Sequence, residues 1–203
     1  MRHETINIYK FSELSEKAQR RAWENGPDFS GDYSGDFRAT LAAFEKIFDI
    51  SVYRWNVNDY NYNFAYVTAG AATEAPENNP LRLARYIWNN YAEYITKGKY
   101  YSTGGRWING KYHYKFRYSK ATFEMDNCPL TGFCYDMDIL QPVLDCLHYK
   151  RFFGSYDELI DACLNEFFQA WQADIEYHAS MEYFAEMCEI NDYEFTETGE
   201  FWK

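Results

Sequence analysis

The stretch that most constrains the fold is residues 155–190, which has the apolar periodicity of a long amphipathic helix. Its first four residues, 155–158, form a capping-box pattern that is typical of a helix N-terminus. An unbroken helix over the whole stretch would span about 54 Å, which is longer than a compact domain of this size needs. We therefore expect either a kink near Ala179 and Ser180 or a protruding arm.

Strand patterns occupy the middle of the chain. Residues 51–68 alternate between two faces, and Asn109-Gly110 lies between two further alternating runs, which is a strong β-hairpin signal. Helical periodicity occurs over residues 12–25, 36–48, 80–97 and 138–153, and residues 71–79 are typical of a small polar linker.

Together these patterns predict an α+β fold. It should contain several helices, a long acidic C-terminal helix and a small antiparallel sheet built from residues 51–68, 100–108 and 111–125. The length of 203 residues and the hydrophobic content of 47% predict a single domain over 1–203. Within that domain, residues 155–203 form an acidic, mainly helical element.

Charge is strongly segregated along the chain. Residues 155–203 contain 13 Asp and Glu and one cation, Lys203, a net charge of 1 − 13 = −12, whereas residues 1–154 sum to +1. Residues 97–120 have the opposite character, with seven Lys and Arg and no acidic residue. Such segregation bears on partners and association rates rather than on fold.

The acidic C-terminal part is the first candidate binding surface. Glu182, Glu186 and Glu189 fall at i, i+4 and i+7, which places them in one line on a helix with neighbours about 6 Å apart. That spacing is close to the separation of successive phosphates, so this line can imitate a nucleic-acid strand in a basic channel. A solvated face, or a face packed on the chain's own basic hairpin, is the alternative interpretation. The candidate partner-binding residues are Asp174, Glu176, Glu182, Glu186 and Glu189.

The basic aromatic hairpin over residues 99–120 is the second candidate surface. Its cations can neutralise phosphates and its rings can stack on bases. The same alternation also describes a half-buried strand whose aromatic face is core. The alternative nucleic-acid-binding residues are Arg106, Trp107, Lys111, Lys115 and Arg117.

Signals for catalysis or metal binding are weak. The spacing of Cys128, Cys134, Cys146 and His148 lacks the short pairs of structural zinc sites. A turn that is rich in Asp, with Asp126, Asp136 and Asp138, fits a helix N-terminus better than a cation site. Cys163 and Cys188 are expected to be small buried hydrophobic residues, and His178 a hydrogen-bonded core residue. We expect no catalytic residue, no metal and no cofactor.

The two ends of the chain resemble small acidic proteins of bacteriophages and mobile elements. The resemblance lies in Tyr9 to Ala18, YKFSELSEKA, and in Asn191 to Gly199, NDYEFTETG. It implies an accessory protein that antagonises host defence by binding a nuclease or its effector complex.

The sequence thus favours an interaction protein without enzymatic activity. We expect it to bind and inhibit a host nucleic-acid-directed defence complex, of the anti-CRISPR or anti-restriction type, through its acidic, aromatic-rich surface. A nucleic-acid-binding accessory protein that uses hairpin 99–120, and an enzyme whose acids converge only in three dimensions, are the other hypotheses. The N-terminus lacks the apolar stretch of a signal peptide, and the odd number of cysteines favours reduced thiols, so we expect the cytoplasm of a bacterial host cell and no membrane association.

Overall fold

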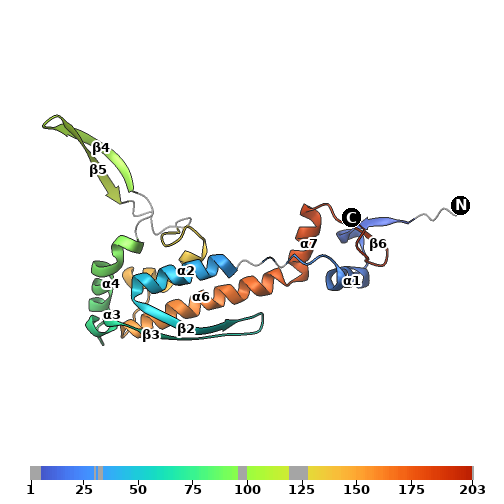
Figure 1. The fold of residues 1–203 in the computed structure, drawn as a ribbon, viewed down its shortest axis with the longest axis horizontal. Helices are drawn as coiled ribbons and strands as arrows, with labels where there is room; N and C mark the ends of the chain where they lie inside the picture. The colour runs from blue at the N-terminus through green and yellow to red at the C-terminus, as the bar shows by residue number, and fades with distance from the viewer. Residues whose placement is uncertain (1–5, 30, 32–33, 96–99, 119–127, 203) are drawn as a thin grey trace. The chain divides into compact units, whose positions relative to one another are not determined.

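The computed structural model describes residues 6–29, 31, 34–95, 100–118 and 128–202. The chain divides into two compact units, whose elements can be followed in Figure 1. Unit 1 consists of residues 1–32, 58–61 and 172–203, and unit 2 of residues 33–57 and 62–171. The α+β fold class is confirmed, and the expectation of one domain over 1–203 stays a prediction.

Unit 1 is assembled from the two ends of the chain. Strand β1 (Ile8–Lys10) pairs antiparallel with β6 (Glu194–Thr196), as Figure 1 shows. In this register Tyr9 lies opposite Phe195. The short helix η1 (Phe11–Glu13) and helices α1 (Glu16–Asn25) and α7 (Met181–Ile190) complete it. Their apolar faces form a core of Phe11, Leu14, Ala18, Ala22, Phe184, Cys188 and Phe195.

Local signals explain where the elements of unit 1 begin and turn. Ser15 caps α1 by accepting a hydrogen bond from the backbone N–H of Ala18, at 3.4 Å. After β6 the chain turns at Gly199, whose φ of +84° suits glycine. A β-carbon there would lie 2.2 Å from the carbonyl oxygen of Ala18, so the turn packs directly on α1.

Unit 2 is built around α6 (Tyr156–His178), whose last residues, 172–178, belong to unit 1. Glu158 at its start donates its backbone N–H to Ser155 Oγ, at 3.1 Å, which confirms the predicted helix start. The side chain of Glu158 also accepts from the Gly154 N–H, at 2.6 Å. The other elements are α2 (Ser34–Phe48), β2 (Ile50–Val57), β3 (Tyr62–Thr68), α3 (Gly70–Glu74), α4 (Pro80–Ile95), β4 (Tyr100–Ile108), β5 (Lys111–Tyr118) and α5 (Tyr135–Leu147).

Aromatic packing fills the centre of unit 2. Phe37 stacks on Trp171, with ring centroids 4.8 Å apart, and Phe64 of β3 stacks on Phe168 at 5.2 Å. The buried Tyr156 hydroxyl donates to the carbonyl oxygen of Phe48, at 2.6 Å. Much of the aromatic content of the chain is therefore core, because these rings lie between α2, α6 and the β2–β3 ribbon.

A buried carboxylate joins α2 to the start of α5. Asp136 is 0% exposed, and its Oδ2 accepts from the backbone N–H groups of Leu130, Thr131 and Gly132 at 2.9, 2.7 and 3.1 Å. Its Oδ1 accepts from the hydroxyls of Thr40 and Thr131, at 2.9 and 2.7 Å. Both oxygens are thus engaged by protein donors, in agreement with an Asp at a helix N-terminus.

The strands differ from the prediction in their partners. The expected single sheet is instead two separate two-stranded ribbons, β2–β3 and β4–β5. Strands β1 and β6, which were not expected to join that sheet, form a further two-stranded ribbon within the described residues. The hairpin at Asn109-Gly110 is confirmed, with φ of +50° and +75° at these two residues. The last part of the expected sheet segment 111–125, with a further short strand over 121–125, lies outside the described residues from position 119 on.

The helices agree with the prediction except at three places. The helix expected over 12–25 is divided into η1 and α1, which begins at Glu16. The expected break occurs at Ala179 and Ser180, where α6 ends and Ser180 caps α7 by accepting from the Tyr183 N–H at 3.1 Å. The expected linker 71–79 instead begins with the short helix α3, and the helix expected over 138–153 runs from Tyr135 to Leu147.

The cysteines give a testable prediction about thiol reactivity. All five lie among the described residues and are reduced thiols; Cys134 is exposed, whereas Cys146, Cys163 and Cys188 are buried. Burial raises the pKa of Cys146 and Cys188 to about 11 and raises that of Cys163 as well. Because the thiolate is the reactive form, a maleimide at about pH 8 should label Cys134 in the folded protein and these three only after unfolding.

Mass spectrometry of peptides from native and urea-unfolded samples measures this labelling. Modification of Cys163 in the native protein at the rate of Cys134 would contradict the buried placement.

Candidate functional site

The charge of the chain is concentrated in unit 1. Its sequence contains six Lys and Arg and 16 Asp and Glu, a net charge of 6 − 16 = −10, out of −11 for the whole chain. Unit 2, which includes the basic hairpin, is therefore close to neutral. The segregation seen along the sequence becomes a segregation between the two units.

Helix α7 presents carboxylates on the side opposite to its buried face. Phe184 and Cys188 point into the core, whereas Glu182, Glu186 and Glu189 are exposed. The predicted line of acids is thus formed on one exposed edge of the helix. Among the described residues, no Lys or Arg forms an ion pair with these three glutamates.

One of the three glutamates is held in place by a neighbouring tyrosine hydroxyl. The Tyr177 hydroxyl donates to Glu186 Oε2 at 2.8 Å, and this hydrogen bond is the main reason why the pKa of Tyr177 is raised. Tyr177 belongs to the end of α6, so the bond spans the break between the two helices. Glu186 is therefore oriented before any partner arrives.

A groove runs along the acidic edge between η1 and α7. Its volume is about 630 Å³, and it is open to solvent. The side chains of Phe11, Ala185 and Tyr193 line it together with Glu182, Glu186 and Glu189. We call this surface, with the groove and the three glutamates, the acidic groove.

The basic residue of the groove is already neutralised. Lys10 Nζ lies 2.8 Å from Asp192 Oδ1 and 3.1 Å from Glu194 Oε1. The hydrogen bond to Asp192 is the main cause of the raised pKa of Lys10. Lys10 is thus paired with Asp192 and Glu194, which leaves the charge of the three glutamates uncompensated.

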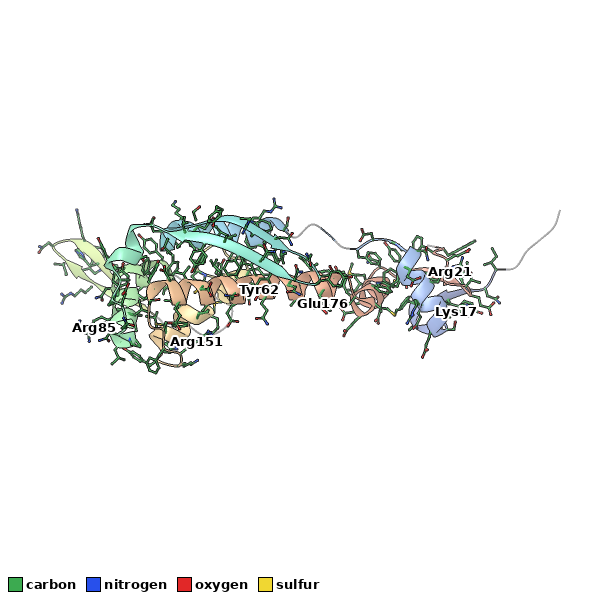
Figure 2. All side chains as sticks on the ribbon, turned by 90° about the horizontal axis from the view of Figure 1, so that it is seen from below. Lys17, Arg21, Tyr62, Arg85, Arg151 and Glu176 are labelled. Carbon is green, nitrogen blue, oxygen red and sulfur yellow. The ribbon has the colours of Figure 1, made fainter. Side chains whose placement is uncertain are left out.

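The other cations in the described part of unit 1 lie on α1. Figure 2 labels Lys17 and Arg21 on this helix, and Arg21 Nη2 pairs with Glu200 Oε1 at 2.8 Å. Lys17, Arg21 and Glu197 line a second depression, of about 540 Å³, which has mixed charge. The excess of negative charge is therefore greater in the acidic groove, where Lys10 is the one cation among the described lining residues, than in this second depression.

Two of the predicted partner-binding residues lie on α6 and differ from each other. Glu176 is exposed and is labelled in Figure 2. Asp174 is half-buried, and the His178 Nδ1 lies 3.3 Å from its Oδ2 and 2.8 Å from its backbone oxygen. Burial raises the pKa of Asp174, and His178 partly offsets this rise. Asp174 is thus engaged within the chain. His178 is hydrogen-bonded as predicted, but it is only partly buried and is not the core residue that the sequence predicted.

The hairpin residues lie in unit 2. Arg106, Trp107 and Lys111 are exposed at the turn end of β4 and β5. Lys115 and Arg117 lie on β5, and their side chains are outside the described set. The acidic and the basic candidate surfaces therefore belong to different units.

The sequence reasoning missed the groove and two of its contacts. No pattern in the sequence indicates that Tyr177 or Lys10 lies beside α7. Lys10 comes close to this helix only because β1 pairs with β6. Asp174 and His178, in contrast, are i and i+4 on a helix, and this spacing could have shown the pair.

Comparison with known protein families, with curated proteins and with solved structures gives no significant match to this chain. The resemblance of the two ends to phage proteins therefore stays a prediction. Within the described residues, no helix combines the length and apolar character that a membrane span requires, and no cluster of three or more metal-ligating side chains occurs.

Proposed function

We propose that this chain is a binding protein without enzymatic activity that uses its acidic groove to occupy a basic surface of a partner. The partner class is a host nucleic-acid-directed defence complex, of the anti-CRISPR or anti-restriction type, whose nucleic-acid-binding surface is blocked. The observation that carries the proposal is the exposed row of Glu182, Glu186 and Glu189 without an ion-pair partner on the described chain.

Electrostatic energy favours such a partner. Like charges at i, i+4 on a helix cost a few tenths of a kcal/mol per pair, roughly, and an opposed basic surface removes this cost. The net charge of −10 on unit 1 also steers a basic partner toward the chain, which speeds association at low salt. A nucleic-acid-binding protein has a basic surface because it must neutralise phosphates.

The apolar side chains that line the acidic groove add contact area for long basic side chains. Lys and Arg bury their aliphatic stems on apolar surface while their charged ends stay polar. Phe11, Ala185 and Tyr193 offer such a surface beside the glutamates. The pre-oriented Glu186 lowers the entropy cost of forming the contact, since its side chain is already held by Tyr177.

The test replaces Glu182, Glu186 and Glu189 together by Gln. Exposed helix positions tolerate Gln with almost no change in helix propensity, so the melting temperature should stay within about 2 °C of the parent. Purified CRISPR effector and restriction complexes that the parent displaces from DNA serve as probes, and a gel-shift competition gives the inhibition constant. Inhibition at about 50 mM salt should weaken by about tenfold, because each exposed pair contributes up to about 1 kcal/mol.

A matched control removes the same charge elsewhere on unit 1. The variant Glu16→Gln, Glu24→Gln, Glu197→Gln changes three exposed carboxylates outside the acidic groove and should inhibit almost like the parent. The difference between the two triple variants should shrink toward 500 mM salt, where screening shortens the Debye length to about 4 Å.

Equal inhibition by the two triple variants and the parent at low salt would remove the acidic groove from the interface. If the groove variant has a lower melting temperature and does not inhibit at any salt concentration, these glutamates instead stabilise the fold. Absence of inhibition by the parent, for every effector and restriction complex tested, would reject the proposed partner class.

A further inference from the structure

The end of the β4–β5 hairpin holds an exposed aromatic pair. Trp107 lies directly opposite Tyr112 across the two strands, and their ring centroids are 5.6 Å apart in an edge-to-face arrangement. Trp107 is 71% exposed and Tyr112 is 40% exposed. An aromatic face that served as core would be buried, so at this end of the hairpin the rings are surface groups.

Cations occupy the other face of the same hairpin end. Side chains alternate between the faces of a strand, and directly opposed residues share a face. Arg106 is opposite His113, and Lys111 is opposite Ile108, so these residues lie on the face away from the rings. Arg106, Lys111 and His113 are all exposed. The sequence contains no acidic residue between positions 97 and 120 that would compete for these cations.

We propose that this hairpin end binds single-stranded nucleic acid, with bases stacked on Trp107 and Tyr112 and phosphates held by Arg106 and Lys111. A stacking site needs an open face of a base, and the bases of a duplex are covered by their neighbours. Arg106 and Lys111 are the chain neighbours of Trp107 and Tyr112 on the opposite face of this two-stranded ribbon, and their long side chains neutralise the phosphates that flank the stacked bases. The ribose or deoxyribose does not enter this chemistry, so both DNA and RNA strands are ligands.

The acidity of the chain does not oppose this binding at moderate salt. Unit 1 carries −10 of the net charge of −11, which leaves −1 for unit 2 with the hairpin. The local cations and rings therefore dominate the interaction of the hairpin end with a strand.

Fluorescence anisotropy with labelled oligothymidylate and oligouridylate of about 20 nucleotides tests the proposal on the full chain. The variant Trp107→Ala, Tyr112→Ala should bind at least about tenfold more weakly than the parent at all salt concentrations, because stacking is not screened. The variant Arg106→Gln, Lys111→Gln should lower the slope of log K against log salt by about 1.4, which corresponds to two phosphate contacts on a single strand.

Two conservative variants separate stacking from hairpin stability. Trp107→Leu, Tyr112→Leu keeps an apolar cross-strand contact without a stacking face and should lose as much affinity as the alanine variant. The variant Trp107→Phe, Tyr112→Phe keeps two rings and should retain most of the affinity of the parent. The matched control is Tyr60→Ala, which removes a ring that is 85% exposed in the turn between β2 and β3, beside Asp59. This variant should bind both oligonucleotides with the affinity of the parent.

The proposal is supported if the parent binds either oligonucleotide and the affinities of the variants change as stated above. No binding by the parent at about 50 mM salt, or equal loss in the Tyr60 variant and the Trp107 and Tyr112 variants, overturns it. Tighter binding of a duplex than of both single strands also overturns it, since a duplex offers no free stacking faces. The residues differ from those of the acidic groove, so this result and the inhibition result are independent.

Discussion

Replacing Asp136 by alanine is expected to destabilise unit 2 by about 3–5 kcal/mol. The carboxylate is 0% exposed and accepts hydrogen bonds from three backbone N–H groups and from two threonine hydroxyls. Alanine would leave these donors without their acceptor, and each buried unsatisfied polar group costs about 1–3 kcal/mol. Urea unfolding, followed by far-UV circular dichroism, measures the loss as a lower midpoint at an unchanged slope.

The matched control is Asp136→Asn. The asparagine amide keeps one oxygen acceptor and the same shape, while its NH₂ group can donate to the hydroxyl oxygens of Thr40 and Thr131. We expect a smaller loss, of about 1–3 kcal/mol, because one charged acceptor is replaced by a neutral one. An alanine variant as stable as the parent would show that water or rearranged side chains satisfy these donors.

Asp136 also illustrates what the sequence could and could not predict. Its place at the start of a helix was predicted, because an Asp-rich turn before an apolar periodic run is a local pattern. Its role as the acceptor that joins α2 to the loop before α5 depends on Thr40, which is distant in the sequence. Local chemistry is visible in one sequence, whereas the partner of a buried polar group is not.

The same distinction holds for the strands and the helices. Asn109-Gly110 predicted its hairpin because the turn needs residues that tolerate positive φ. A period of two shows which face of a strand is buried but not which strand it pairs with, so the two ribbons β2–β3 and β4–β5 were predicted as one sheet. The helix α3 was missed because its five residues are too few to show a period.

The candidate site was predicted in part. The line of Glu182, Glu186 and Glu189 followed from helical spacing alone, and the break before it followed from the excessive length of residues 155–190. The groove beside it needs the register of β1 with β6, which joins Lys10 to Glu194 across the whole chain. That register is a long-range pairing, and a single sequence carries no signal for it.

Replacing Phe195 by alanine tests whether this long-range pairing holds unit 1 together. Phe195 is 0% exposed, and its ring lies 6.0 Å from that of Phe11 and 6.4 Å from that of Phe184. Removing a fully buried phenylalanine costs about 3–5 kcal/mol, from lost burial and from the cavity that remains. Since the whole core of unit 1 consists of its own residues, the loss should be confined to that unit.

Hydrogen exchange measured by mass spectrometry resolves where the stability is lost. Amides of α1, α7, β1 and β6 should exchange faster by about two to four orders of magnitude in the variant, while those of α4 and α5 keep their protection. Phe201→Ala, which removes a ring that is 45% exposed at the same end of the chain, is the control and should have a small effect. Equal loss of protection in both units would show that the chain unfolds as one cooperative domain, and inhibition through the acidic groove should then be lost together with the whole fold.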